Sequence, residues 1–301
     1  MGSMEMNLGL RRLSAALICA LLHGPALAQT AGSPATTPAA PPAAVEQCGE
    51  VLSLPAHEGS QRYAWRPPAA GAEPLSLILL PGGAGYLNLD ERGCPRALSG
   101  NSLVRSIPLF AAAGFGTALL DAPTAHQGED GLGGYRIAPE HAADIGRVVA
   151  ELRARTKGRV WIVGTSRGAI SAANAAARLS GAAAPDGVVL TSALMSGDPR
   201  ARKFWVAHSV FDLPLEEIRM PLLLVGHAAD RCVRSPAARM GEVIERAKGA
   251  TRKQMVTVSG GPGTPGPAGL AACEGRTPHG YVDQESEVAA GIVRFVKGGS
   301  Y

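Results

Sequence analysis

A serine between two glycines is a candidate nucleophile. Ser166 lies in the segment Gly164–Gly168, GTSRG, directly after the apolar run Val160–Val163. A serine hydroxyl is a weak nucleophile at neutral pH, and it attacks a carbonyl carbon efficiently only when a nearby imidazole takes its proton. A carboxylate then fixes the tautomer of that imidazole. If Ser166 is a nucleophile, its partners must be found among the histidines and the acidic residues of the chain.

The apolar run before Ser166 is one of six that predict strands. These runs do not alternate apolar and polar residues, so we expect both faces of each strand to be buried, as in a parallel sheet covered by helices. The six runs are Leu75–Gly83, Gly116–Pro123, Arg159–Ser166, Asp186–Leu194, Met220–Asp230 and Lys253–Gly261.

The segments between these runs have helical patterns. Pro139–Arg155 is the clearest, because its apolar residues fall on one face and its charges on the other. The other expected helices are Ser102–Ala113, Gly168–Leu179, Pro236–Lys248 and Gln284–Lys297. Alternating strands and helices predict an α/β fold with right-handed crossovers. Glu50–Arg66 is expected to add antiparallel edge strands.

In this context GTSRG resembles the nucleophile elbow of the α/β-hydrolase superfamily, which has the pattern G-x-S-x-G between a strand and a helix. The resemblance extends from about Leu52 to Val296. It implies a mostly parallel central sheet flanked by helices. A side chain at Gly164 or Gly168 would collide with the neighbouring strand or helix. Residues 190–220 leave room for a short helix, so no large lid is expected.

The resemblance also implies the chain order serine, acid, histidine. An acid should follow a later strand, and a histidine should follow the last one. Asp230 and His279 satisfy this order, so the expected triad is Ser166, Asp230 and His279. Asp198 and Asp212 are alternative acids, because some members of the superfamily carry the acid after the preceding strand.

Other histidines fit the order less well. His227 is close to Asp230 in sequence but is misplaced for the base, and His57 precedes the core sheet. His141 is expected on the surface of a helix. His126 could line the pocket.

The tetrahedral intermediate of such a reaction carries an oxyanion that needs fixed N–H donors. By resemblance, one donor is the backbone N–H of Arg167, directly after the nucleophile. The other should come from the PGGAG segment, with Gly83 as donor and Ala84 as its neighbour. Pro81 stands where related H-G-x loops have histidine.

The N-terminus has the pattern of an export signal. Arg11 and Arg12 precede the apolar run Leu13–Leu22, and an A-x-A pattern ends at Ala28. We expect a signal peptide over residues 1–28, a Pro/Ala-rich flexible leader over 29–46 and a hydrolase domain over 47–301. The expected location is the periplasm or the extracellular space. No later segment resembles a membrane anchor.

Removal of the signal peptide would leave four cysteines, which permit disulfides in an exported protein. Sequence alone allows three pairings. In the expected fold the loops after Asp230 and before His279 must meet, so we predict a Cys232–Cys273 bridge. Cys48–Cys94 then follows by elimination.

Charge excludes some other functions. There are 29 basic and 25 acidic residues, a net charge of +4, and the basic residues are scattered. Nucleic-acid binding is therefore not expected.

No dinucleotide fingerprint or metal-ligand spacing is found, so no cofactor or metal is implied. The sequence specifies no oligomeric state.

The expected function is an exported serine hydrolase that cleaves small-molecule carboxylic esters through an acyl-enzyme. The same triad also serves amide, thioester, lactone and peptide hydrolases and perhydrolases. A secreted polyester hydrolase and an inactive, purely binding member of the fold are further alternatives.

Overall fold

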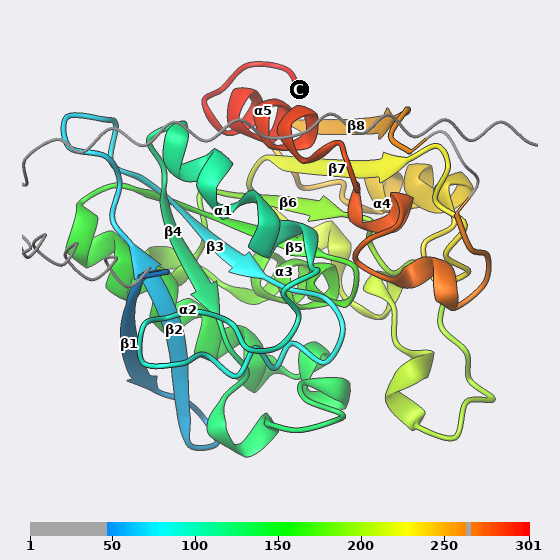
Figure 1. Cartoon of the computed structure of the whole chain (residues 1–301), viewed down its shortest axis with the longest axis horizontal. Helices are drawn as coiled ribbons and strands as arrows, with labels where there is room; N and C mark the ends of the chain where they lie inside the picture. The colour runs from blue at the N-terminus through cyan, green and yellow to red at the C-terminus, as the bar shows by residue number, and fades with distance from the viewer. Residues whose placement is uncertain (1–46, 263–265) are drawn as a thin grey trace, which may run out of the picture. The chain divides into compact units, whose positions relative to one another are not determined.

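The computed structural model describes residues 47–262 and 266–301. The expected signal peptide (1–28) and leader (29–46) lie outside the described residues, so these two expectations remain predictions. Within the described part, an eight-stranded sheet forms the centre of the domain (Figure 1).

The strand order in the sheet is β1-β2-β4-β3-β5-β6-β7-β8. Strand β2 runs antiparallel to its neighbours β1 and β4, and the other neighbouring strands are parallel. The strands are β1 (Glu50–Pro55), β2 (Ser60–Arg66), β3 (Leu75–Leu80), β4 (Gly116–Leu120), β5 (Arg159–Thr165), β6 (Gly187–Thr191), β7 (Leu222–His227) and β8 (Lys253–Val258).

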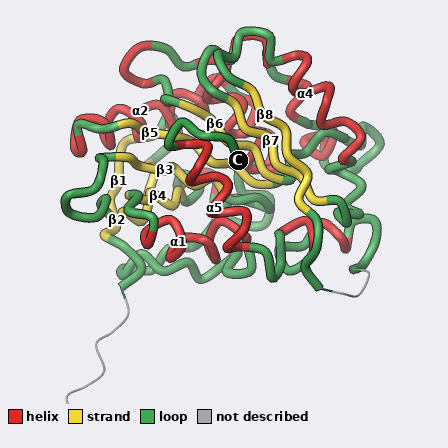
Figure 2. The backbone as a smooth tube through the Cα atoms, turned by 90° about the horizontal axis from the view of Figure 1, so that it is seen from above, coloured by secondary structure: helices red, strands yellow, loops and turns green. Residues whose placement is uncertain are grey.

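Helices cover both faces of this sheet. Helices α1 and α5 lie together on one face, and α2, α3 and α4 lie on the other (Figure 2). The helices are α1 (Ser102–Ala112), α2 (Pro139–Thr156), α3 (Arg167–Arg178), α4 (Met240–Arg246) and α5 (Glu285–Val296).

The strand composition explains this three-layer arrangement. Within β5, Val160 and Ile162 pack toward α2 and α3, whereas Trp161 and Val163 pack toward the α1 and α5 side. Successive side chains of a strand point to opposite faces, so a continuous apolar run supplies both halves of the core. This confirms the prediction of a mostly parallel sheet, and burial on both faces is found for β3 to β7. For the run Lys253–Gly261 the expectation of two buried faces is wrong. Strand β8 is the edge strand, and its residues Lys253, Met255 and Thr257 are exposed.

Each of the six apolar runs contains a strand, and Glu50–Arg66 forms the antiparallel strands β1 and β2, of which β1 is at the edge of the sheet and β2 lies between β1 and β4. The expected helix Pro236–Lys248 is shorter than predicted. It consists of a 3₁₀ turn at Ala237–Arg239 followed by the two-turn helix α4. Between β6 and β7 the described chain forms only short 3₁₀ helices, which agrees with the absence of a large lid.

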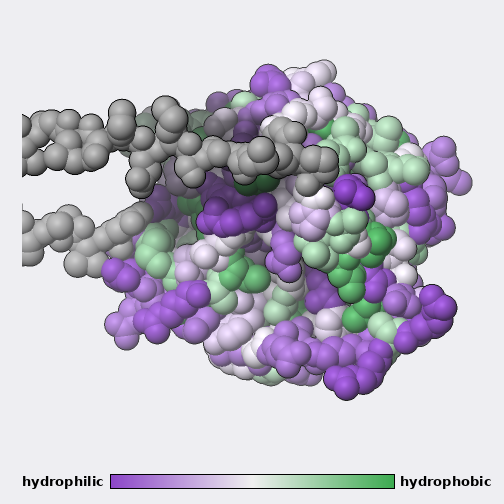
Figure 3. Space-filling model, turned by 45° about the vertical axis from the view of Figure 1, so that its right-hand side comes forward, coloured by the Kyte–Doolittle hydropathy of each residue, from purple (hydrophilic) through white to green (hydrophobic). Residues whose placement is uncertain are grey.

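The surface drawn in Figure 3 mixes hydrophilic and hydrophobic residues. Among the described residues, none of the helices has both the length and the apolar character needed to cross a membrane. The chain contains the two expected disulfides, Cys232–Cys273 and Cys48–Cys94.

Candidate active site

The candidate nucleophile lies on a strained turn at the end of β5. Ser166 joins β5 to α3 with a φ of +53°, in the left-handed region that most residues avoid. Its backbone N–H donates to the carbonyl of Thr191 at 2.9 Å, which fixes the turn to β6. Strain of this kind persists only where the surrounding structure enforces it, and it is concentrated at functional sites.

Glycines make this tight turn possible, as the sequence predicts. A Cβ at Gly164 would lie 2.4 Å from the carbonyl oxygen of Gly168, and one at Gly168 would lie 1.9 Å from that of Leu80. Gly82, which sequence analysis did not single out, is equally constrained, because its Cβ would lie 2.8 Å from the Cβ of Ser166. The loop after β3 therefore lies directly against the nucleophile.

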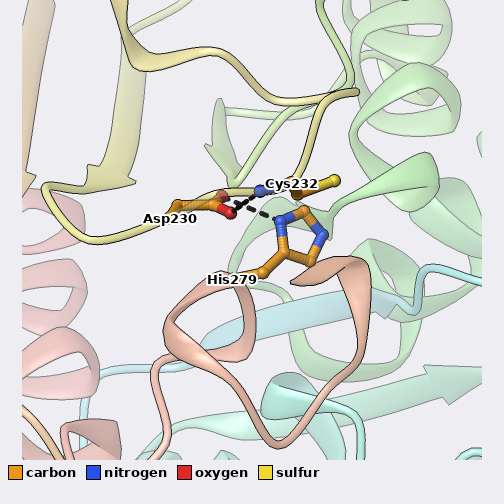
Figure 4. Close-up of side chains that lie close together, drawn as sticks. All are labelled: Asp230, Cys232 and His279. Atoms are coloured by element: carbon orange, nitrogen blue, oxygen red, sulfur yellow. Dashed lines mark hydrogen bonds and ion pairs between the residues drawn. The ribbon is translucent and has the colours of Figure 1, made fainter. Parts of the chain in front are cut away.

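The expected acid and base are hydrogen-bonded to each other. Nδ1 of His279 lies 2.8 Å from Oδ2 of Asp230, and both side chains are 3% exposed (Figure 4). Oδ1 of Asp230 accepts the backbone N–H of Cys232 at 2.8 Å, which fixes the carboxylate. Nε2 of His279 has no hydrogen-bond partner among the described residues. This arrangement leaves Nε2 available to accept a proton from a substrate or a nucleophile.

The loop that carries His279 is anchored to the sheet. The Ser192 hydroxyl donates to the carbonyl of His279 at 2.6 Å. The Tyr281 hydroxyl donates to the carbonyl of Val225 at 2.8 Å and accepts the N–H of Ser192 at 2.9 Å. These bonds tie the histidine loop to the ends of β6 and β7.

Arg105 of α1 holds the same loop from the other side. Its guanidinium donates to the carbonyls of Gly275 at 2.8 Å and Gly280 at 2.7 Å, and also to the carbonyl of Gly100. It pairs with Glu285 at 2.7 Å. The role of Arg105 was not predicted, because nothing local in the sequence indicates that Gly275, Gly280 and Glu285, about 170–180 residues further along the chain, are its partners.

Two cavities meet at Ser166. The first, of about 310 Å³, is lined by three arginines together with apolar residues, and we call it the arginine cavity. Its lining residues are Gly83, Gly133, Arg136, Ser166, Arg167, Ile170, Leu194, Trp205, Val206, His208, Arg234, Leu270 and Cys273.

The second cavity, of about 190 Å³, contains His279 and Ser166 in its wall, and we call it the histidine cavity. Ser166, Gly83 and Cys273 line both cavities. Two compartments on either side of one serine could accept the two parts of a substrate.

The candidate oxyanion donors fall partly where they are expected. Arg167 is the first residue of α3, so its N–H has no carbonyl one turn earlier to bond. Gly83 lines both cavities, whereas Ala84 lines neither, and its carbonyl accepts the N–H of Leu132. Gly83 thus fits a donor role better than Ala84.

Two buried charged residues anchor the loop that contains Gly83. Arg136 donates to the carbonyls of Pro81 at 3.2 Å and Gly83 at 3.3 Å. Further along the loop, Asp121 accepts the N–H groups of Leu87 at 2.6 Å and Leu89 at 3.0 Å. Neither anchor was identified from the sequence.

The rival acids have other partners. Asp198 lies 3.6 Å from Arg234, and Asp212 forms a capping box with Ser209. In the described chain, neither of these carboxylates is bonded to His279. Asp230 is therefore the acid that the structure joins to this histidine.

The remaining histidines are also placed. His227 bonds Gln284 and, through Nδ1, the N–H of Ala229 at 2.9 Å, so it braces the loop that leads to Asp230. His126 stacks on Tyr135 and is not among the residues that line the two cavities.

One histidine expectation is wrong, and one residue was missed. His141 is 2% exposed rather than on the surface, because Nε2 lies 2.9 Å from the hydroxyl of Ser171 inside the α2–α3 interface. His208 lines the arginine cavity, although nothing in the sequence marked it.

Asp230, Cys232 and His279 lie close enough together to suggest a metal centre. The sulfur of Cys232, however, is bonded to Cys273, and the carboxylate and the imidazole are bonded to each other. The cluster therefore fits a hydrogen-bonded acid–base pair beside a disulfide.

The eight-stranded, mostly parallel sheet with helices on both faces and a tight turn between β5 and α3 is the α/β-hydrolase fold, and the chain has this fold. Comparison of the sequence with protein-family models and with curated proteins gave no match.

Solved structures agree with this fold. The chain is similar to an α/β serine hydrolase homologue from Coxiella burnetii, with 16% identity, a TM-score of 0.51, and 84% of this chain and 99% of that chain covered. It is also similar to a Pyrococcus furiosus esterase, with 14% identity, a TM-score of 0.55 and coverage of 82% and 91%. A thermophilic esterase from Thermogutta terrifontis has 15% identity, a TM-score of 0.53 and coverage of 82% and 92%.

Proposed function

We propose that the chain is an exported serine hydrolase that cleaves carboxylic esters through an acyl-enzyme. One observation carries this proposal. Asp230 holds Nδ1 of His279, while Nε2 has no partner in the part of the chain that the structure describes, and the histidine shares a cavity with Ser166. The strained backbone at Ser166 supports the role of this residue as nucleophile.

In the proposed reaction, Ser166 attacks the ester carbonyl and Nε2 of His279 takes the hydroxyl proton. Asp230 keeps the imidazole in the tautomer with the proton on Nδ1 and stabilises the imidazolium that forms. The backbone N–H groups of Arg167 and Gly83 would bind the oxyanion. The imidazolium then protonates the leaving alcohol, and water attacks the acyl-enzyme by the same route.

Export is part of the proposal. It is supported by the basic and apolar pattern of residues 1–28 and by the two disulfides, which are typical of oxidising compartments. Ester cleavage in particular is supported by the likeness in fold to proteins described as esterases.

The test combines active-site labelling with hydrolysis. A fluorophosphonate probe should label Ser166, and Ser166→Ala should abolish labelling and lower kcat for p-nitrophenyl esters by several orders of magnitude. Ser180→Ala is a matched control, because Ser180 is exposed and its side chain makes no cap bond.

Amide, thioester and lactone substrates in the same panel identify the preferred bond. A folded protein that is neither labelled nor active on any of them would be a binding protein, and the proposed function would then be wrong.

A further inference from the structure

The arginine cavity has an excess of positive charge beside the nucleophile. Arg136, Arg167 and Arg234 line it, and none of the described lining residues is acidic. The N-terminus of α3 adds partial positive charge at the same place. An esterase pocket for neutral substrates needs none of these charges.

Arg136 is the least compensated of the three. Its side chain is buried, with the residue 2% exposed, and its described partners are the neutral Ser171 hydroxyl, at 2.8 Å, and the carbonyls of Pro81 and Gly83. Nε has no acceptor in the described part of the chain. A buried charge without a counter-ion is unfavourable, which an anion bound nearby would offset.

Burial makes the charge of Arg136 costly. Burial, with a further contribution from the charge of Arg167, lowers the pKa of Arg136 to about 9. The group nevertheless stays protonated at neutral pH. The uncompensated charge is therefore present under ordinary conditions.

The other two arginines are only weakly neutralised. Arg167 stacks over Trp205, with its guanidinium carbon 3.7 Å from the ring centroid, and donates to the carbonyl of Gly83. Arg234 pairs with Asp198 at 3.6 Å, but that carboxylate is 40% exposed, so the pairing is screened by water. A compact anion in the cavity would face both guanidinium groups.

Apart from Ser166 and His208, the rest of the cavity wall is largely apolar. Ile170, Leu194, Val206 and the Trp205 ring lie among the arginines. A volume of about 310 Å³ is at the lower end for small-ligand sites. Such a cavity suits a short hydrocarbon segment that ends in a charged group.

We infer that the arginine cavity binds a carboxylate of the substrate, so that the ester cleaved at Ser166 carries a free carboxylate a few carbons from the scissile bond. This inference rests on the proposed function. Guanidinium groups recognise carboxylates through paired, charge-assisted hydrogen bonds. The arginines that line the cavity can supply such donors while the apolar residues contact the hydrocarbon segment.

The first experiment compares isosteric esters. Mono-p-nitrophenyl glutarate is paired with p-nitrophenyl 5-methylhexanoate, in which an isopropyl group replaces the carboxylate. A second pair, the butyrates of 4-hydroxybenzoate and 4-isopropylphenol, carries the charge on the alcohol instead. In one of the two pairs, kcat/KM should favour the anionic ester by about 100-fold at low salt, and the preference should fall as salt rises.

Variants assign the preference to the cavity. Arg234→Gln should lower the ratio of anionic to neutral kcat/KM about tenfold or more, and Arg234→Lys should restore part of it. Arg219→Gln is the control, because Arg219 is exposed and forms a surface ion pair with the nearby Glu217. Equal kcat/KM within both pairs, in an enzyme that cleaves neutral esters, would overturn the carboxylate inference and leave the proposed function intact.

Binding without turnover separates the two proposals. Glutarate, titrated calorimetrically into Ser166→Ala, should bind, and the added change Arg234→Gln should weaken binding about tenfold. If no ester is cleaved and Ser166 is not labelled, the hydrolase proposal fails. The glutarate titration then tests the anion site by itself. Absence of glutarate binding would then overturn the anion site as well.

Discussion

Replacement of Arg105 by alanine tests whether the histidine loop is held in place by a clamp from α1. The guanidinium of Arg105 is 14% exposed, joins three backbone carbonyls and pairs with Glu285. A net value of about 1 kcal/mol for each bond to a carbonyl gives a loss of about 3 kcal/mol in unfolding free energy. For a domain of this size that corresponds to roughly 6–12 °C in Tm.

The larger effect should be on catalysis. Gly275 and Gly280 flank His279, so loss of their common donor lets the imidazole move relative to Ser166. A displacement on the order of 1 Å can cost about 100-fold in rate. We expect kcat to fall about 10- to 100-fold with little change in KM, because Arg105 does not line either cavity.

The assay is steady-state ester hydrolysis at a temperature well below the Tm of the variant, and thermal unfolding is measured separately. Arg155→Ala is the matched control, because Arg155 makes an exposed i,i+4 pair with Glu151, which is worth at most about 0.5 kcal/mol. If Arg105→Ala keeps kcat within twofold of the parent protein while Tm falls, Arg105 only stabilises the fold and the positioning argument is refuted.

Three further outcomes are expected. Asp230→Asn should lower kcat by several orders of magnitude while Asp198→Asn lowers it less than tenfold, and the reverse order would show that the acid is misassigned. Replacing Cys232 and Cys273 with alanine should lower the free energy of unfolding by about 4 kcal/mol, calculated for their separation of 41 residues. An unchanged urea unfolding midpoint would contradict this. Burial, with a smaller contribution from a neighbouring arginine, lowers the pKa of His141 to about 3, so this imidazole is neutral in the native state but takes up a proton in the unfolded chain below about pH 6.5. Acidification from pH 7.5 to 5 should therefore lower the free energy of unfolding by roughly 2 kcal/mol through His141. In urea unfolding, the His141→Gln variant should lose less stability over this pH range than the parent protein.

The sheet was predictable because its strands carry their own evidence. The run Val160–Val163 before Ser166 is apolar at every position, and its β-branched and aromatic residues and the glycine after it favour a strand buried on both faces. The glycines on either side of Ser166 were equally informative, since the structure confirms that a side chain at either would collide with backbone. The order of the elements then indicated Asp230 and His279, which the structure joins by a hydrogen bond.

The polar supports of the site could not be predicted in this way. Arg105 and Arg136 look in sequence like ordinary surface arginines, and their roles depend on carbonyls contributed by distant loops. His141 was misjudged for the same reason. It was assigned to a helix surface, but its hydrogen-bond partner on α3 lies 30 residues further along the chain. Helical periodicity identifies an apolar face, but it does not reveal that a polar side chain has found a buried partner.

The Cys232–Cys273 disulfide also has a consequence for survival among proteases. Cys232 follows Asp230 by two residues, and Cys273 precedes His279 by six, so the bridge closes a ring that contains α4 and β8 but neither catalytic candidate. A single peptide-bond cleavage anywhere inside this ring leaves the fragment with His279 and α5 covalently joined to the fragment with Ser166 and Asp230. The hydrogen bonds of the histidine loop to β6, β7 and α1 lie outside the ring and would still hold the fragments in register. A nicked molecule should therefore run as two pieces only after reduction, and it should keep its candidate catalytic residues together until then.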